Sequence, residues 1–398
     1  MVSPWLTIVG IGEDGLDGLS AASRDAISRA AVVAGAPRHL ALVGKTSARQ
    51  LEWPVPFADG VEQVLALRGQ LVVALASGNP FWFGAGAVLV QRLVPEEWVA
   101  YPSPSSFSLA VSRLGWRMED VVCLGLHASP LTRLRPHLCA NARLILTLRD
   151  SGSVRDLMGL LTELGFGPSC LWIMEALGGP REKIRCIHAC DEPRSKIGTP
   201  VLAAIEVAGS GAALAHCAGL ADDVFEHDGQ ITKRPVRALT ISALAPKTGE
   251  LLWDIGAGSG SVAIEWLLAH RSMRAIAIEA DAGRAARLVR NAAALGADRL
   301  ILQHGTAPDV LTGLPLPDAV FIGGGCNQSM LEALWRILPT GARLVANSVT
   351  LETEILLLHW HGKVGGSLLR IELADAQPLG SKRGWRSAMP IVQWSVVR

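Results

Sequence analysis

The sequence predicts two unlike α/β domains in one chain, the second of them a seven-stranded, Rossmann-like sheet. Apolar runs after residue 250 alternate with helical patterns, which predicts a parallel sheet covered by helices. A glycine-rich turn at 256–260 follows the first of these runs, and the first 210 residues carry a different set of strands. A length of 398 residues is typical of two or three domains. We therefore expect a domain over 1–210, a linker over 211–230 and a domain over 231–398.

In the N-terminal half, several predicted strands end in small or polar residues. Residues 6–10 predict a strand that runs into a glycine-rich loop, and 20–31 predict a helix. Further strands are expected at 71–76, 99–101, 121–126 and 144–148, and then, without helices between them, at 171–176, 183–188 and 201–207. The last three predict an antiparallel or mixed sheet. Ligands of α/β sheets bind beyond the carboxyl ends of strands. The candidate site residues here are Gly10, Gly12, Ser77, Gly78, Asn79, Ser105, Ser106 and His127.

The C-terminal half predicts a single sheet. Strands are expected at 251–255, 275–279, 300–303, 319–322, 343–347, 368–373 and 390–396. Helical patterns separate the early strands, at 261–270, 284–295, 330–338 and 352–361. No helix fits between the last two strands, so we expect them to form an antiparallel pair.

A glycine loop in this half predicts an adenosine-containing cofactor. The apolar strand at 251–255 carries Asp254 and runs into Gly256, Gly258 and Gly260. That layout brings backbone N–H groups and a helix N-terminus to a ligand. Twenty-five residues after Asp254, a second strand ends in Glu279, whose carboxylate can accept hydrogen bonds from a ribose diol.

The spacing of the glycines favours S-adenosylmethionine (SAM) over NAD(P). A dinucleotide site requires its third glycine at the position that Ser261 occupies. Equal steps between glycines are typical of SAM methyltransferases. We expect Asp254 to attract the ammonium group of SAM, directly or through water, and Thr306 to lie near the adenine.

The turn after the fourth strand of this half bears on the substrate. Methyltransferases that modify amino groups of nucleic acid bases usually carry an Asn/Asp-Pro-Pro-aromatic motif there, whereas this chain has Gly323, Gly324 and Gly325. Three glycines remove side chains and expose backbone donors. We interpret the turn as room for a bulky substrate edge, with a flexible loop as the alternative.

Both halves resemble known SAM-dependent families. The N-terminal half resembles the tetrapyrrole (corrin/porphyrin) methylases, a two-lobed class III fold, in Ile8-Val9-Gly10-Ile11-Gly12, Ser77-Gly78-Asn79-Pro80 and Pro104-Ser105-Ser106. The C-terminal half resembles the C15-methylating, decarboxylating unit of cobalamin biosynthesis, a class I fold, in Ile231-Thr232-Lys233-Arg234-Pro235-Val236-Arg237-Ala238-Leu239 and in the glycine loop. Asn79 stands where the first family usually has Asp, and the Gly-Arg that often follows His127 is absent.

The resemblance implies a bifunctional precorrin methyltransferase with a SAM site in each half. The N-terminal half would methylate C5, its Gly10–Gly12, Ser77–Pro80 and Ser105–Ser106 loops surrounding SAM. The C-terminal half would methylate C15 and decarboxylate the acetate arm of ring C. His127 is a catalytic candidate, and the alternative is a structural histidine that only forms hydrogen bonds. A polycarboxylate substrate requires cations, and the candidates near the second site are Lys233, Arg237 and Arg383.

Composition disfavours several other classes. The formal net charge is +1, from 37 basic and 36 acidic residues, and a nucleic-acid binder would more often show a basic excess. The uncharged stretch between Arg68 and Arg92 is interrupted by glycine, proline and polar residues, so we expect no membrane span. No signal peptide is recognisable, which predicts a cytoplasmic protein. Cys186, His188 and Cys190 match no standard metal-site spacing, so we expect no metal.

Three alternative functions stay open. They are an NAD-dependent oxidoreductase, a non-catalytic module that senses SAM, and a nucleic-acid methyltransferase. We also expect a homo-oligomer.

Overall fold

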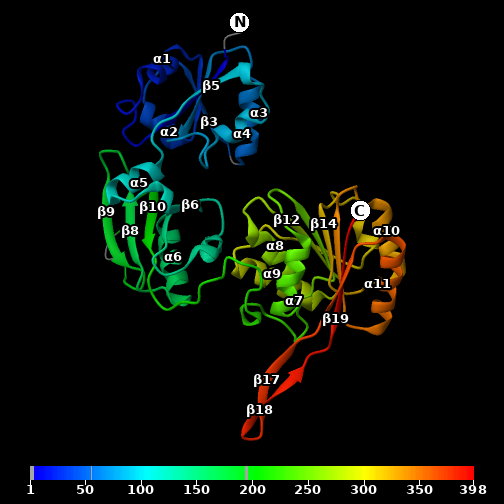
Figure 1. The fold of residues 1–398 in the computed structure, drawn as a ribbon. Helices are drawn as coiled ribbons and strands as arrows, with labels where there is room; N and C mark the ends of the chain where they lie inside the picture. Colours follow the sequence, from blue (N-terminus) through cyan, green and yellow to red (C-terminus); the bar gives the residue numbers. More distant parts are fainter. Residues whose placement is uncertain (1–3, 55, 193–195) are drawn as a thin grey trace. The chain divides into compact units, whose positions relative to one another are not determined.

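The computed structural model describes residues 4–54, 56–192 and 196–398 (Figure 1). Contacts divide the chain into two compact units. Unit 1 extends to Leu131 and continues from His137 to Ala212, and unit 2 comprises Thr132–Pro136 and Ala213–Arg398. The expected linker over 211–230 differs from this division, because nearly all of it packs on unit 2. Its apolar side chains Leu214, Leu220 and Phe225 are buried in that unit's core.

The first lobe of unit 1 is a parallel sheet in the order β3-β2-β4-β1-β5. The strands are β1 (Leu6–Ile11), β2 (Val32–Gly35), β3 (Arg49–Glu52), β4 (Val72–Ser77) and β5 (Trp98–Tyr101). The helices are α1 (Ala21–Arg29), α2 (Pro37–Val43), α3 (Phe57–Leu65) and α4 (Gly86–Val90). Apolar side chains that alternate along β1 enter two different cores, because successive side chains point to opposite faces of a sheet.

The second lobe of unit 1 is a mixed sheet in the order β6-β7-β10-β8-β9. Strands β6 (Val121–Gly125) and β7 (Arg143–Leu148) are parallel. Strand β10 (Val201–Glu206) runs antiparallel to β7 and β8 (Cys170–Glu175), and β9 (Lys183–His188) pairs antiparallel with β8. The predicted mixed sheet is therefore present. The helices of this lobe are α5 (Ser106–Leu114) and α6 (Ser151–Glu163).

Unit 2 is a seven-stranded sheet in the order β13-β12-β11-β14-β15-β19-β16. The first five are parallel: β11 (Leu251–Ile255), β12 (Arg274–Glu279), β13 (Ile301–His304), β14 (Ala319–Ile322) and β15 (Arg343–Ser348). β16 (Ser367–Ile371) and β19 (Ile391–Val397) form the expected antiparallel pair. All seven strands overlap their predicted ranges.

Helices cover both faces of this sheet. One core contains side chains of α7 (Arg234–Leu244), α8 (Ser261–Ala269) and α9 (Ala282–Ala294), and the other contains those of α10 (Gln328–Ile337) and α11 (Leu351–Val364). A hairpin of β17 (Ala374–Leu379) and β18 (Lys382–Ser387) extends from the end of the unit (Figure 1).

Candidate functional site

A cavity of about 810 Å³ opens at the carboxyl ends of the parallel strands of unit 2. It lies where the sequence predicts a cofactor, because the loops after β11, β12 and β14 meet there. Its lining includes Gly256, Gly258, Ser259, Glu279, Thr306, Gly323 and Gly324.

The glycines of the loop after β11 are required by its shape. Gly256, Gly258 and Gly260 have φ of +68°, +58° and +77°, a region that side-chain-bearing residues rarely adopt. A Cβ on Gly256 would lie 2.7 Å from the carbonyl oxygen of Gly324, so the two glycine turns meet in direct backbone contact. A Cβ on Gly260 would instead strike Leu288 of α9, which gives that glycine a packing role. Gly260 is not among the residues that line the cavity.

Asp254 is completely buried beneath this loop. Its Oδ2 accepts a hydrogen bond from the backbone N–H of Ala263 at 3.0 Å, whereas Oδ1 has no partner in the described part of the chain. Burial raises the pKa of Asp254 to about 7, and the nearby charge of Glu279 adds to the increase. The buried Oγ of Ser259 also has no partner there. Ser259 lines the cavity, whereas Asp254 lies beneath the loop and is not among the lining residues. The two unsatisfied polar atoms fit a ligand that carries ammonium and hydroxyl groups.

Glu279 links the end of β12 to the glycine loop. One carboxylate oxygen accepts the N–H of Gly258 at 2.7 Å, and the other accepts the N–H of Asp281 at 2.9 Å. These two bonds fix the carboxylate at the cavity wall. Each oxygen retains lone-pair capacity for a further donor such as a ribose hydroxyl.

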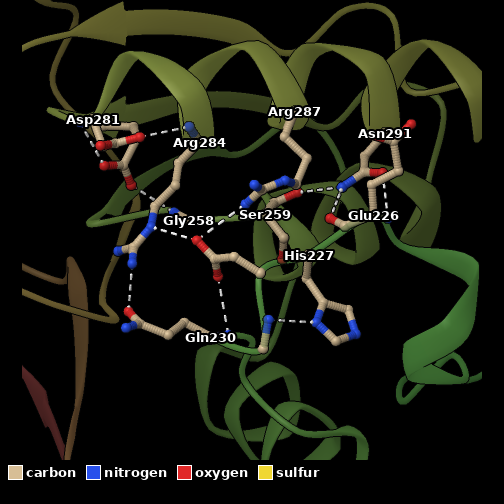
Figure 2. A network of polar contacts seen from close by, with 12 residues as sticks. Glu226, His227, Gln230, Gly258, Ser259, Asp281, Arg284, Arg287 and Asn291 are labelled. Carbon is tan, nitrogen blue, oxygen red and sulfur yellow. Dashed lines mark hydrogen bonds and ion pairs between the residues drawn. The ribbon is translucent and has the colours of Figure 1, made fainter.

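Residues 226–231, which we name the strap, are fastened along α9 beside the glycine loop (Figure 2). Asn291 donates to the backbone oxygens of both Glu226 and Ser259 at 2.9 Å. Asp228 pairs with Arg284 at 3.0 Å and with Arg287 at 3.1 Å. The backbone N–H of Gln230 bonds to Asp228, which is the largest cause of the lowering of the Asp228 pKa to about 2.

The strap was not predicted from the sequence. Its partners on α9 are spaced three and four residues apart, the spacing of one helix face. That spacing is the one feature of the sequence that could have indicated a polar segment packed along α9.

Two of the predicted substrate residues do not lie at this cavity. The prediction that Arg237 binds substrate was wrong. Its side chain is fully buried, and its guanidinium donates to Glu265 at 2.6 Å and to Asp222 at 3.0 Å. It anchors the chain before α7 and has no access to a substrate. Arg383 is exposed on the β17–β18 hairpin and is not among the lining residues. Lys233 does line the cavity.

Unit 1 has its own cavity of about 610 Å³. Most of the predicted residues line it: Gly12, Ser77, Gly78, Ser105, Ser106 and His127. Gly10 and Asn79 do not. A Cβ on Gly10 would lie 1.8 Å from the carbonyl oxygen of Gly78, so Gly10 permits two loops to touch. The Oδ1 of Asn79 accepts the N–H of Phe81 at 3.0 Å, which stabilises the turn after β4.

His127 has a local hydrogen-bonding role at the wall of this cavity. Its Nδ1 lies 3.0 Å from the Oγ1 of Thr147, and its backbone oxygen accepts from Arg149 at 3.1 Å. Partial burial lowers the pKa of His127, and the charge of Arg149 lowers it further. The imidazole is therefore predominantly neutral near pH 7.

The same cavity carries a polar cluster of Glu13, Arg38, His39 and Ser77. Ser77 was predicted from the sequence, whereas the other three residues were not. His39 is buried, and burial lowers its pKa to about 3, with a smaller contribution from Arg38. Glu13 lies in the loop after β1, Arg38 and His39 lie in α2, and Ser77 ends β4, so no local pattern marked the cluster.

Among the described residues, no helix is both long and apolar enough to cross a membrane. The same part of the chain contains no group of three or more His, Cys, Asp or Glu side chains placed to hold a metal.

Comparisons with known proteins identify the family. Residues 5–187 match the Tetrapyrrole (Corrin/Porphyrin) Methylases, and residues 223–398 match the Precorrin methyltransferase domain. A relative from Sinorhizobium sp, named precorrin-6Y C(5,15)-methyltransferase (decarboxylating), is 48% identical over 99% of this chain and 97% of its own length. The chain belongs to this family.

A second full-length relative agrees with the assignment, and one solved structure is similar to the C-terminal half of the chain. A relative of the same name from Mycobacterium tuberculosis (strain CDC 1551 / Oshkosh) is 38% identical over 99% of this chain and 100% of its own. The crystal structure of the C-terminal domain of precorrin-6Y C5,15-methyltransferase from Rhodobacter capsulatus is 52% identical, covers 46% of this chain and 100% of that chain, and has a TM-score of 0.45. The resemblance inferred from the motifs is thus confirmed. The protein is a methyltransferase, and membership of such a family implies use of SAM.

Proposed function

We propose that the chain uses SAM to methylate a precorrin at C5 and C15 and decarboxylates the acetate arm of ring C, in aerobic cobalamin biosynthesis. The observation that carries the proposal is the 48% identity to a named C(5,15)-methyltransferase over nearly the whole chain. Each unit also contains a separate cavity at its predicted SAM loops.

In unit 2, the residues at the cavity fit SAM. We assign the methionine end to the glycine loop above Asp254, the ribose to Glu279 and the adenine to the neighbourhood of Thr306. SAM supplies an electrophilic methyl group when bound. The Oδ1 of Asp254 has no partner among the described residues, and the ionised carboxylate would provide negative charge for the ammonium. Glu279 is already oriented by two backbone N–H groups.

The remainder of the unit 2 cavity suits a macrocycle. Gly323 and Gly324 add no side chains, so a flat substrate edge can approach the glycine loop. Lys233 supplies a cation for a substrate carboxylate. An electron-rich carbon held in line with the methyl group needs little more than positioning, which contributes much of the rate of such transfers.

In unit 1, we assign SAM to the loops after β1 and β4 and to the N-terminus of α5, and the C5 methylation to this cavity. Trp82 lines the cavity and stacks on Phe107 with ring centroids 5.3 Å apart. Such a flat aromatic surface suits a conjugated ring system. We also retain a cytoplasmic location and a homo-oligomeric state as proposals, to be checked by cell fractionation and light scattering.

The test uses the full chain with precorrin-6B and SAM, followed by mass spectrometry of the product. Glu279→Ala should abolish methyl addition at C15 and spare addition at C5. Gly12→Val, whose new Cβ would meet only the exposed Asp14 side chain, should do the reverse. Loss of both methyls from either single variant would contradict separate sites. A wild-type protein that binds SAM and transfers no methyl would instead be a SAM-sensing module.

A further inference from the structure

Four polar residues form a connected cluster on one wall of the unit 1 cavity. The guanidinium of Arg38 donates to Glu13, and its Nη2 lies 2.8 Å from the Oγ of Ser77 and 2.9 Å from the Nε2 of His39. The Nε2 of His39 lies 2.9 Å from the same Oγ. Arg38 is therefore held in one orientation at the cavity wall.

The charges of this cluster do not cancel. Glu13 is buried, and its second carboxylate oxygen accepts from Arg181 at 2.8 Å. Two guanidinium groups thus share one carboxylate, while His39 contributes no charge because its pKa is far below neutrality. One positive charge remains in excess. An anion entering the cavity would neutralise it.

A buried atom without a partner indicates a ligand at the same place. His39 is 7% exposed and lines the cavity, and its Nδ1 has no hydrogen-bond partner in the described part of the chain. Buried polar atoms are normally satisfied, so this one is explained by a ligand or a water molecule. The cluster combines a fixed guanidinium, a hydroxyl and an imidazole, which together suit a carboxylate.

We propose that Arg38, oriented by Glu13, binds a carboxylate in the cavity of unit 1. This inference rests on the proposed function, which supplies two sources of that group. One is the methionyl carboxylate of SAM, and the other is a carboxylate arm of the precorrin. Ser77 and His39 complete the site as a hydroxyl and a neutral ring.

The test compares Arg38→Gln and Arg38→Lys with Arg49→Gln, which removes an exposed arginine of unit 1 that does not line the cavity. Calorimetry on the full chain measures the affinity for SAM and for decarboxylated SAM, which lacks the carboxylate. Steady-state assays give the KM for precorrin in C5 methylation. The SAM site of unit 2 and the C15 methylation serve as internal controls.

If the carboxylate belongs to SAM, Arg38→Gln should weaken one of the two SAM sites by about tenfold or more and leave decarboxylated SAM unaffected. If it belongs to the precorrin, SAM affinity should hold and the C5 KM should rise by about tenfold or more. Arg38→Lys, which keeps the charge, should lose less in either case and replaces the glutamine variant if that one does not fold. Unchanged SAM affinity together with an unchanged C5 KM would overturn the inference. A wild-type chain that does not methylate C5 would contradict the proposed function, and the two SAM titrations would still decide the role of Arg38.

Discussion

The carboxyl group of Asp254 is buried completely, and this burial raises its pKa to about 7. Below that pH the free protein holds the group mostly protonated. A cationic ligand prefers the ionised form, so SAM binding below pH 7 must release a proton. We therefore expect the SAM affinity of unit 2 to fall as the pH is lowered from about 7.5 to 5.5, by at most about tenfold per pH unit.

Calorimetric titrations over this pH range would measure the effect, with the unit 1 site as the reference. Asp254→Asn should bind more weakly at neutral pH and lose the pH dependence. If the SAM affinity of wild-type unit 2 stayed constant over this pH range, Asp254 would not interact with the charge of the ligand.

Gly324 allows a direct test of the substrate side of the unit 2 cavity. Its φ is not left-handed, and the nearest atom to an added Cβ, the oxygen of Gly256, would lie 3.9 Å away. Valine is therefore accommodated without backbone movement and fills space in the cavity. We expect Gly324→Val to raise the KM for precorrin in C15 methylation by about tenfold, or about 1.4 kcal/mol, because the new side chain occupies space that the substrate edge needs.

The matched control is Gly362→Val, at a position in α11 where an added Cβ meets no atom within 4 Å. It should leave both methylations unchanged. Unaltered turnover in Gly324→Val would remove the turn 323–325 from the substrate path.

At the scale of elements, α9 holds both the strap and the glycine loop, because Asn291 donates to the backbone oxygens of Glu226 and Ser259. Asp228 pairs with two arginines, and all three side chains are only 23–32% exposed. The outer pair of Glu226 with Arg290 is more than half exposed, so solvent screens it more strongly. Asp228→Asn should loosen the strap and speed SAM dissociation from unit 2 by about threefold to tenfold, whereas Glu226→Gln should have little effect.

Stopped-flow displacement of SAM would give the rates, and hydrogen exchange of residues 226–231 would report on the strap itself. Equal dissociation rates in the two variants would show that the Asp228 pairs do not retain the cofactor.

Most strands with an apolar run were predicted, whereas β2, β3 and the β17–β18 hairpin were not. β14 carries an unbroken apolar run and β11 a run interrupted only by Asp254, and their ranges agreed with the prediction. β3 is short, largely exposed and polar, and β17 is exposed along its whole length and contains Pro378, so neither showed a strand signal.

The same limit applies to the candidate site. The glycine loop and Glu279 follow consecutive strands, so local sequence marked them. Arg237 resembled a free cation because its partners Asp222 and Glu265 lie 15 and 28 residues away and meet it only after folding. Arg38 was not recognised for a similar reason: Glu13, in the loop after β1, and Ser77, at the end of β4, meet it only after folding.

At the scale of the whole molecule, each unit has a core of its own and a cavity lined entirely by its own residues. Ligand binding to one folded unit stabilises that unit by mass action, by about 2.7 kcal/mol at a ligand concentration of 100 times Kd. Units of this size gain roughly 2–4 °C in Tm per kcal/mol. We therefore expect saturating SAM to raise the Tm of both units by roughly 5–10 °C.

Glu279→Ala should cancel the increase in Tm of unit 2 alone, and Gly12→Val should cancel that of unit 1 alone. Differential scanning calorimetry of the intact chain would resolve the two effects. If either variant abolished both shifts, the two SAM sites would not be independent, and a division of the two methylations between the units would lose its physical basis.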